Sequence, residues 1–177
     1  MSEYELLRNE ILENYDAIKQ YNLALYVAVI SVLTFALDKQ NFLYCLIPYI
    51  AIIPLYFACE SKNRNICKIA AYMNVFLEGN EYNWEMLHQK YDEKFNKKRN
   101  WKSISQYYFL SIMCSAIAIA KIFQLDYDTN TKWVLFSIVL IVTIVAIIAM
   151  GLSTINYVNC RKAMLENWKK IKNEQID

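Results

Sequence analysis

The stretch WVLFSIVLIVTIVAIIAMGLSTINY, residues 133–157, decides the fold class, because 25 consecutive residues carry no charged side chain. At a rise of 1.5 Å per residue, a helix of this length crosses the roughly 30 Å hydrocarbon core of a bilayer. In a soluble bundle the same helix would have to be buried on every side, and the chain has little polar sequence to cover it. The stretch therefore predicts a transmembrane helix.

Three further uncharged runs precede it. They are NLALYVAVISVLTFAL at residues 22–37, FLYCLIPYIAIIPLYFAC at residues 42–59, and a run from residue 104 that is closed by Lys121, giving a third span of residues 104–121. The first two are short for a span, but the four polar residues 38–41 between them are typical of a helical hairpin. The chain is expected to be an all-α membrane protein with four transmembrane helices, arranged as two long hairpins with cytoplasmic helical extensions. A soluble bundle with buried helices is the alternative.

The composition agrees with this class. The 177 residues are 56% hydrophobic and 20% charged, whereas a soluble domain is about 45–50% apolar and about 25% charged. Only 2 Gly and 2 Pro argue against a turn-rich β fold. A net charge of +2 is too small to indicate general nucleic-acid binding, so DNA is not expected as a partner. The acidic residues before the first run do not fit a signal peptide, and the chain is interpreted as one domain, residues 1–177.

The distribution of Lys and Arg predicts the orientation. Two lie in residues 1–21, nine in residues 60–103 and five in residues 158–177, which leaves Lys39, Lys121 and Lys132 for the opposite side. Because cytoplasmic segments of membrane proteins carry the excess of Lys and Arg, the three basic-rich segments and both termini are expected to be cytoplasmic.

These extensions are expected to be helical stalks. Apolar spacing predicts that the helix of residues 2–21 runs unbroken into the first span. Residues 66–77 should continue the second span and stop near Gly79-Asn80, and a helix opening at Asn83 or Trp84 should enter the third span. The fourth span should run on through residues 161–172.

The sequence offers little catalytic chemistry. His88 is the only histidine, no Gly-rich phosphate loop is present, and the five cysteines have no metal-ligand spacing. No catalytic, cofactor-binding or metal-binding residues are predicted, no cofactor is expected, and the protein is not expected to be an enzyme. The basic run at residues 97–99 is best interpreted as a topology signal.

A polar stripe along the first helix is the most informative feature. Its members follow one another three or four residues apart, and they lie on one continuous helix face. They are Asn9, Glu13, Asp16, Gln20, Ala24, Val27, Ser31, Thr34 and Asp38. Polar groups are costly in hydrocarbon, so this face should not meet lipid. Either it packs against the other helices of the same subunit, or the residues from Glu13 to Asp38 line a water-filled lumen shared by a ring of subunits.

Two smaller patterns concern helix packing. Ser111 with Ser115, and Ala116 with Ala120, have the small-xxx-small spacing that suits close contact between membrane helices. Pro48 and Pro54 interrupt the second run, and both are expected to remove hydrogen bonds from its helix and bend it.

Taken together, the length, the acidic helix entering residues 22–37 and the basic middle segment resemble the small membrane accessory protein of type VI-B CRISPR systems, the partner of an RNA-guided, RNA-targeting nuclease. The Asn-, Lys-, Tyr- and Ile-rich composition suggests an AT-rich bacterial genome. The chain is also similar, more broadly, to four-span bacterial defence effectors. The resemblance implies a homo-oligomeric pore in the bacterial inner membrane that depolarises the cell when the nuclease is activated by phage RNA.

Some members of that family carry a degenerate ribonuclease signature, an Arg followed four to six residues later by His. Here His88 has no Arg at that distance before it, so no catalytic residue is carried over. The expected partners are further copies of the chain, the lipid bilayer, and the CRISPR nuclease or its RNA products. The alternative function is a non-conducting membrane anchor or adaptor that recruits a cytosolic partner through its stalks. A membrane-embedded enzyme would need clustered ionisable groups that these spans lack.

Overall fold

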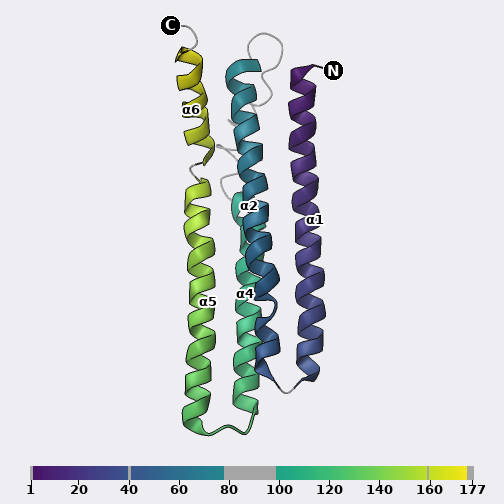
Figure 1. Ribbon diagram of the computed structural model, residues 1–177, viewed down its shortest axis with the longest axis vertical. Helices are drawn as coiled ribbons and strands as arrows, with labels where there is room; N and C mark the ends of the chain where they lie inside the picture. Colours follow the sequence, from purple (N-terminus) through teal and green to yellow (C-terminus); the bar gives the residue numbers. More distant parts are fainter. Residues whose placement is uncertain (1, 40, 78–98, 159, 175–177) are drawn as a thin grey trace. The chain divides into compact units, whose positions relative to one another are not determined.

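The computed structural model describes residues 2–39, 41–77, 99–158 and 160–174 of the chain. Its described residues are almost entirely helical and contain no β-strand (Figure 1). The elements in chain order are α1 (Glu3–Asp38), the 3₁₀ helix η1 (Phe42–Leu46), α2 (Tyr49–Tyr72), the one-turn π-helix η2 (Met73–Leu77), α4 (Arg99–Gln124), α5 (Thr129–Val158) and α6 (Cys160–Glu174). Among the described residues, four stretches are long and apolar enough to cross a membrane, and each covers all or nearly all of one uncharged run. The protein is an all-α membrane protein, as predicted.

Helix α1 is continuous from the N-terminal segment through the first apolar run, which confirms the prediction from its spacing. It begins with a capping box, in which the backbone N–H of Ser2 donates to Glu5 Oε2 at 2.9 Å and the N–H of Glu5 donates to Ser2 Oγ at 3.3 Å. Its buried side recurs every three or four residues through the apolar run, at Leu25, Val29 and Leu33. This apolar face holds the helix against the rest of the membrane unit.

The second apolar run differs from the expected single bent helix. It opens as η1, where the Asn41 side chain accepts a hydrogen bond from the N–H of Leu43 at 3.0 Å. The chain then restarts at Pro48, whose carbonyl accepts from the N–H of Ala51 at 3.0 Å and of Ile52 at 2.9 Å. Proline suits the start of a helix, because its missing N–H has no helical partner there. The expectation that Pro48 bends a helix was therefore wrong: it immediately precedes α2, and Pro54 alone lies inside that helix.

The stalk predictions are confirmed as far as the described residues reach. Helix α2 continues past its apolar run to Tyr72, and η2 carries it on to Leu77. The fourth apolar run is followed by α6, with residue 159 between the two helices outside the described part. The expected stop at Gly79-Asn80 and the expected helix from Asn83 or Trp84 also lie outside the described residues.

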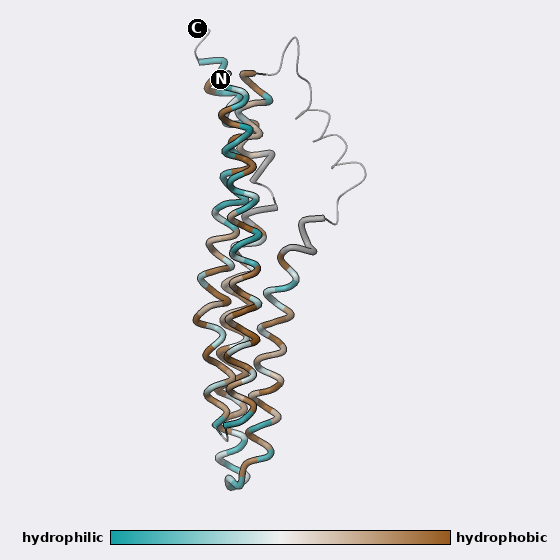
Figure 2. Tube along the Cα trace, turned by 90° about the vertical axis from the view of Figure 1, so that its right-hand side faces the viewer, coloured by the Kyte–Doolittle hydropathy of each residue, from teal (hydrophilic) through white to brown (hydrophobic). Residues whose placement is uncertain are grey.

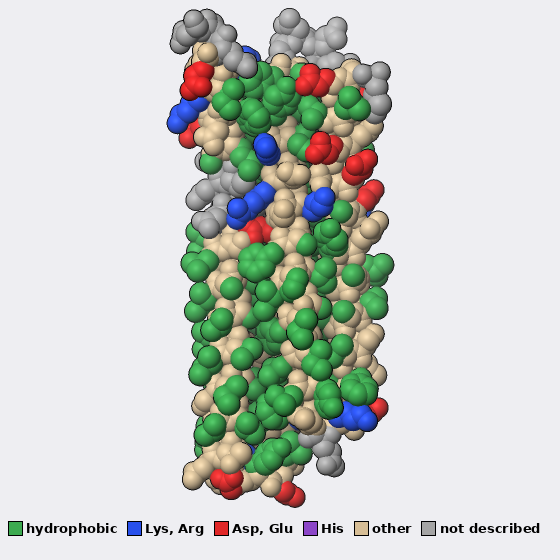
Figure 3. All heavy atoms as spheres, viewed as in Figure 1, with side chains coloured by type: hydrophobic (Ala, Val, Ile, Leu, Met, Phe, Trp, Pro, Cys, Tyr) green, Lys and Arg blue, Asp and Glu red, His purple; other side chains and the backbone are tan. Residues whose placement is uncertain are grey.

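The chain forms two compact units. The membrane unit comprises Tyr21–Ala58 and Lys102–Leu152, and the stalk unit comprises Met1–Gln20, Cys59–Trp101 and Ser153–Asp177. Hydrophobic residues predominate along the trace of the membrane unit, whereas hydrophilic residues recur in the stalk unit (Figure 2). Side chains of the apolar runs also cover much of the surface that Figure 3 draws over α2 and α5.

Candidate functional site

The polar stripe predicted on the first helix lies on the outward face of α1. Each of its members is exposed: Asn9, Glu13, Asp16, Gln20, Ala24, Val27, Ser31, Thr34 and Asp38. The opposite face is the buried one, with Ile18, Val29 and Ala36 among its members. Asn9 and Glu13, at the stalk end of the stripe, also border a cleft that Lys62 and Asn65 of α2 line. Packing within the subunit and lining a lumen therefore both stay predictions.

The stripe carries two kinds of polar group. In the stalk, Lys19 Nζ lies 2.8 Å from Asp16 Oδ1, and both side chains are well exposed, so this ion pair contributes little stability. In the apolar run, the hydroxyl of Thr34 donates to the carbonyl of Ile30 at 2.8 Å. That bond uses the hydroxyl proton and leaves the oxygen free to accept. The stripe is therefore acidic in the stalk unit, and in the membrane unit it is weakly polar as far as Thr34 and acidic again at Asp38.

Helix α5 shows what a lipid-facing surface of this protein looks like. From residue 138 to residue 155, every exposed residue of α5 is Ile, Leu or Val. In the uncharged run of α1, residues 22–37, the exposed residues include Ser31 and Thr34 among apolar side chains such as Leu23 and Ile30. Both helices are long enough to span a bilayer, and only the outward face of α1 carries polar side chains within these stretches. Those two hydroxyls are less suited to acyl chains than the wholly apolar exposed residues of α5.

A polar network fixes the inner side of α1 to α4 within the membrane unit. The Asn22 side-chain oxygen accepts from Gln106 Nε2 at 2.6 Å and from the Tyr107 hydroxyl at 2.9 Å. The Tyr26 hydroxyl donates to Gln106 Oε1 at 2.8 Å. Such bonds set the rotation of one membrane helix against another. Here they hold α1 with its stripe turned outward.

A buried hydroxyl cluster joins α2, α4 and α5 in the same unit. The Tyr49 hydroxyl lies 2.6 Å from Ser115 Oγ and donates to the Ser111 carbonyl at 2.8 Å, and Ser115 Oγ lies 2.6 Å from Thr143 Oγ1. Thr143 in turn donates to the carbonyl of Val139 at 2.7 Å. The cluster is neutral, and each of these three hydroxyls has a partner. It confirms that one small-xxx-small pair, at residues 111 and 115, packs inside, whereas Ala116 and Ala120 face outward.

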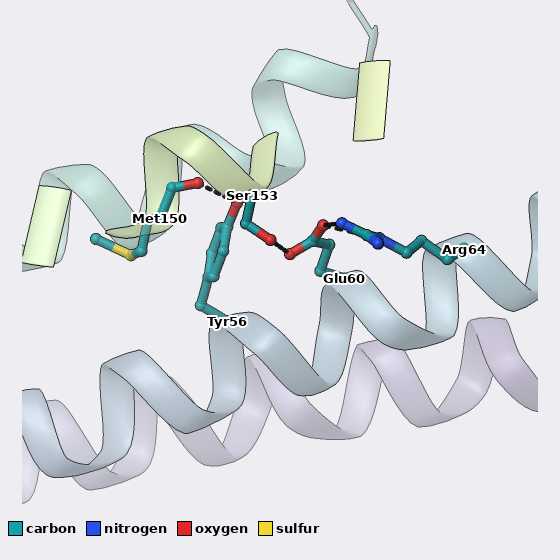
Figure 4. A network of polar contacts seen from close by, with 5 residues as sticks. All are labelled: Tyr56, Glu60, Arg64, Met150 and Ser153. Carbon is teal, nitrogen blue, oxygen red and sulfur yellow. Dashed lines mark hydrogen bonds and ion pairs between the residues drawn. The ribbon is translucent and has the colours of Figure 1, made fainter. Parts of the chain in front are cut away.

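An ionic network around Glu60 was not predicted from the sequence. Glu60 is only 7% exposed, and its carboxylate accepts from Arg64 Nε at 2.9 Å and Nη2 at 2.5 Å (Figure 4). The Ser153 hydroxyl donates to the other carboxylate oxygen. All three residues belong to the stalk unit. Figure 4 also draws a separate bond of the membrane unit, from the Tyr56 hydroxyl to the Met150 carbonyl at 2.8 Å.

The signal for this network was present in the sequence. Glu60 follows the second apolar run directly, and Arg64 lies one helical turn later, the spacing at which opposite charges meet on a helix. Ser153 is 93 residues from Glu60 in the chain, and no local pattern indicates that contact. A buried carboxylate is retained only when it is paired and hydrogen-bonded, and both conditions are met here.

An aromatic cluster organises the stalk unit. Trp168 of α6 meets Tyr72 with ring centroids 5.2 Å apart, and Trp168 Nε1 donates to the Lys68 carbonyl at 3.2 Å. The Tyr72 hydroxyl donates to Glu3 Oε1 at 2.9 Å, which joins α1 to the cluster. This hydrogen bond to a carboxylate raises the pKa of Tyr72 above its usual value, because losing the proton would leave two negative groups together.

The described residues contain no group of three or more His, Cys, Asp or Glu side chains that would hold a metal ion. His88 and the basic residues at 97 and 98 lie outside the described part of the chain. Three of the cysteines, Cys45, Cys59 and Cys114, are buried, and none of the three is in a disulfide.

Comparison with protein-family models, with curated proteins and with solved structures finds no match to this chain.

Proposed function

We propose that the protein is a homo-oligomeric pore of the bacterial inner membrane that depolarises the cell. The observation that carries this proposal is the uncovered polar face of α1, from Glu13 in the stalk to Asp38 at the far end of the helix. Its place in antiviral defence beside a CRISPR RNA-targeting nuclease rests on the resemblance of the sequence to the type VI-B accessory proteins.

The need for several subunits follows from where the stripe lies. Gln20, Ser31 and Thr34 are exposed on a helix that is long and apolar enough to cross a membrane, and polar groups of that kind are costly against lipid. Because the stripe is on the outside of the protomer, a single copy cannot enclose it. Several copies arranged with their α1 helices inward would surround a polar lumen and leave the apolar face of α5 for the bilayer.

The charges along the stripe favour cations. Glu13 and Asp16 would form two acidic rings in the stalk, and Asp38 would form a third at the other end of α1. Rings of carboxylates attract cations and repel anions. The acceptor oxygens of Ser31 and Thr34 would line the apolar stretch between them.

The orientation with both termini in the cytoplasm is part of the proposal. Its basis is the charge bias of the sequence, and the three lysines that oppose the bias have local partners. Lys121 donates to backbone carbonyls at the end of α1, and Lys132 donates to the carbonyl of Phe123 at 3.4 Å. Lys39 lies over the Phe35 ring, 5.2 Å from its centroid. On the side of the membrane with fewer basic residues, these three lysines therefore contact groups near helix ends.

The decisive experiment measures membrane potential in cells that express the protein with its cognate nuclease, with and without target RNA. We expect depolarisation when target RNA is present. An unchanged potential under every condition would refute the pore.

The stripe is tested by Gln20→Leu combined with Thr34→Leu. These substitutions make the lumen surface apolar, and we expect loss of depolarisation with the size of the detergent-solubilised particle unchanged. Ser137→Leu is the matched control, because Ser137 is exposed on α5 and its hydroxyl donates to the Trp133 carbonyl at 2.9 Å, as Thr34 does to Ile30. Full activity of the double variant would refute the lumen role of the stripe.

The second candidate function is a membrane adaptor. The stalk unit favours it, since α1 and α2 form an open polar cleft of about 600 Å³ there, lined by residues that include Glu10, Glu13, Lys62 and Asn65. A protein that is monomeric in detergent and never depolarises cells, yet retains a cytosolic partner at the membrane, would establish the adaptor instead.

A further inference from the structure

The outward face of α1 has two unlike sides, one on each side of the stripe. Its centre is formed by Gln20, Val27 and Thr34, which follow one another at seven-residue intervals. On a helix, positions four before and three after a given residue lie on one side of it, and positions three before and four after lie on the other.

On one side of this centre lies the large flank, formed by Leu23, Ile30 and Leu37. They are 65%, 59% and 60% exposed, so each stands out from the helix as a knob. On the other side lies the small flank, formed by Ala17, Ala24 and Ser31. Each flank repeats at seven-residue intervals, the period that keeps one face of a helix against a parallel partner.

This asymmetry matters because a polar centre between two flanks must be shielded from lipid. A partner that shields Gln20 and Thr34 from lipid must contact α1 along its flanks. In a ring with the stripe turned inward, each α1 has two neighbouring α1 helices, one on each flank. In a closed ring every subunit is equivalent, so the large flank of one α1 meets the small flank of the next. Leu23 and Ala24 are adjacent in sequence, as are Ile30 and Ser31. In a ring of parallel α1 helices, each large residue of one subunit is therefore at nearly the same height as a small residue of the next, with a difference of about 1.5 Å along the helix axis.

We infer that the partner of this face is a second copy of the same chain, with the large flank of one α1 packed in parallel into the small flank of its neighbour. The inference rests on the proposed pore and specifies how its subunits join. Small residues let helix backbones approach closely in a membrane, and knobs such as Leu23 and Ile30 fill the space they leave. Two large flanks would instead hold the helices apart, and two small flanks would leave a void.

Charge in the stalk supports the same pairing. Lys19 precedes Leu23 by four residues, and Arg8 precedes Leu12 by four, so both lie on the side of the large flank. Glu5 precedes Leu12 by seven residues and lies on that side too, and Lys19 is paired with Asp16 of the same helix. Glu10 precedes Ala17 by seven residues and continues the small flank. Both Arg8 and Glu10 are exposed and lie at nearly the same height along α1. The small-flank side is acidic at Glu10, whereas the large-flank side carries basic residues as well as Glu5, so charge favours contact between unlike flanks over contact between two small flanks.

Cysteine cross-linking in cell membranes tests the pairing. Ile30→Cys combined with Ser31→Cys places one thiol on each flank, and oxidation with copper phenanthroline should join successive subunits into a ladder of species larger than a dimer. Either single variant should give no ladder, since its new thiol faces a residue that is not cysteine. The unmodified chain controls for the native cysteines, and Ile141→Cys with Val142→Cys controls for chance collision, because these residues are adjacent and exposed on α5.

The outcomes separate this inference from the proposed pore, because cross-linking does not depend on conduction. A ladder without depolarisation supports the flank pairing and refutes the pore. Depolarisation without a ladder in this pair, and in Leu23→Cys with Ala24→Cys one step along the helix, refutes the flank pairing. Dimers formed by Ile30→Cys alone or by Ser31→Cys alone would show contact between like flanks and would also refute the flank pairing.

A compensating substitution gives a second measurement. Ala24→Leu fills the small flank, and we expect it to reduce the size of the detergent-solubilised assembly. Adding Leu23→Ala removes the knob that it meets and should restore the original size. If Ala24→Leu reduces the size of the assembly and adding Leu23→Ala does not restore it, residues 23 and 24 of neighbouring subunits are not paired.

Discussion

The ammonium of Lys121 on α4 closes the carboxyl end of α1, with its Nζ 2.5 Å from the carbonyl oxygen of Ala36. It also donates to the carbonyl of Leu37 at 2.9 Å and to that of Lys39. The last carbonyls of a helix have no partner in the next turn, and the helix dipole makes that end negative. One side chain therefore neutralises the end of α1 and ties it to α4 within the membrane unit.

Replacing Lys121 should loosen this hairpin end. Lys121→Met keeps much of the side-chain volume but removes the charged donor, and we expect a loss of about 1.5–3 kcal/mol in the free energy of unfolding, the usual cost of a hydrogen bond to a charged group. Unfolding by SDS in mixed micelles, followed by circular dichroism, measures it. Lys132→Met is the control, since its single bond is 3.4 Å long and should contribute less. Equal losses in the two variants would contradict the capping role.

Arg64→Ala should destabilise the stalk unit strongly. It would leave the Glu60 carboxylate, whose side chain is 8% exposed, without its cation. Breaking a buried pair costs about 3–5 kcal/mol, and we expect a value near the lower end because the Arg64 side chain is 42% exposed. The same unfolding assay measures the loss.

The matched double variant, Glu60→Gln with Arg64→Met, removes both charges and should recover most of that stability. The control for a general charge effect is Asp16→Asn with Lys19→Met, since this pair is exposed and should change stability by about 0.2–1 kcal/mol. A double variant no more stable than Arg64→Ala alone would show that the ion pair itself is not what Arg64 supplies.

The hydroxyl cluster predicts a smaller and cooperative effect. Tyr49→Phe removes the donor to the Ser111 carbonyl and the contact with Ser115, and Thr143→Val removes the hydroxyl on the other side of Ser115. Each should cost about 1 kcal/mol, because polar contacts inside membranes are worth roughly 0.6–2 kcal/mol. A double-mutant cycle should give less than the sum of the two losses, since both act through Ser115. Strict additivity would contradict a shared network.

Features carried by local pattern could be predicted from the sequence. The uncharged runs predicted the four spans, and the apolar spacing within residues 2–21 predicted a first helix that runs unbroken into its span. The stripe was correctly identified as one face, because residues three and four apart must share it. Which way that face turned could not be predicted, because it depends on contacts such as Gln106 with Asn22, 84 residues apart.

The missed features depend on tertiary contacts or on competing local rules. The pairs Ser111 with Ser115 and Ala116 with Ala120 have the same spacing, but only Ser115 bonds through its side chain, to Tyr49 and Thr143. Ser111 contributes its backbone carbonyl, and its buried hydroxyl has no partner among the described residues. Pro48 was expected to bend a helix because the uncharged run extends on both sides of it. The run is interrupted there because proline is better accommodated at the start of a helix than inside one.

The loop before α5 should respond to acid. The Asp128 carboxylate accepts from the N–H of Thr131 at 3.1 Å, and hydrogen bonds from Thr131 lower the pKa of Asp128 below its ordinary value of 3.8. A carboxyl with a lowered pKa stabilises the folded state above the unfolded pKa, and this contribution is lost as the pH falls through the folded pKa. The difference in stability between the wild-type chain and Asp128→Asn should therefore be constant near neutral pH and shrink below pH 3.8. Hydrogen exchange at the first turn of α5 measures it, and a difference that persists unchanged in acid would contradict the cap.

The acidic residues Glu13 and Asp16 of the stripe should determine the ion selectivity of the pore. Glu13→Gln with Asp16→Asn removes two exposed carboxylates per subunit and leaves Lys19 unpaired, so the stalk end of the lumen becomes less negative. Under a KCl gradient across a planar bilayer, the reversal potential should shift toward zero, because fewer fixed charges exclude chloride. Glu166→Gln on α6 removes an exposed carboxylate that is not in the stripe, and it should leave the reversal potential unchanged. Raising the salt to about 1 M shortens the Debye length to about 3 Å and should reduce the difference between variant and wild type. A conducting variant with the wild-type reversal potential at low salt would show that ions do not pass these carboxylates, and the lumen would then have to be formed by another face.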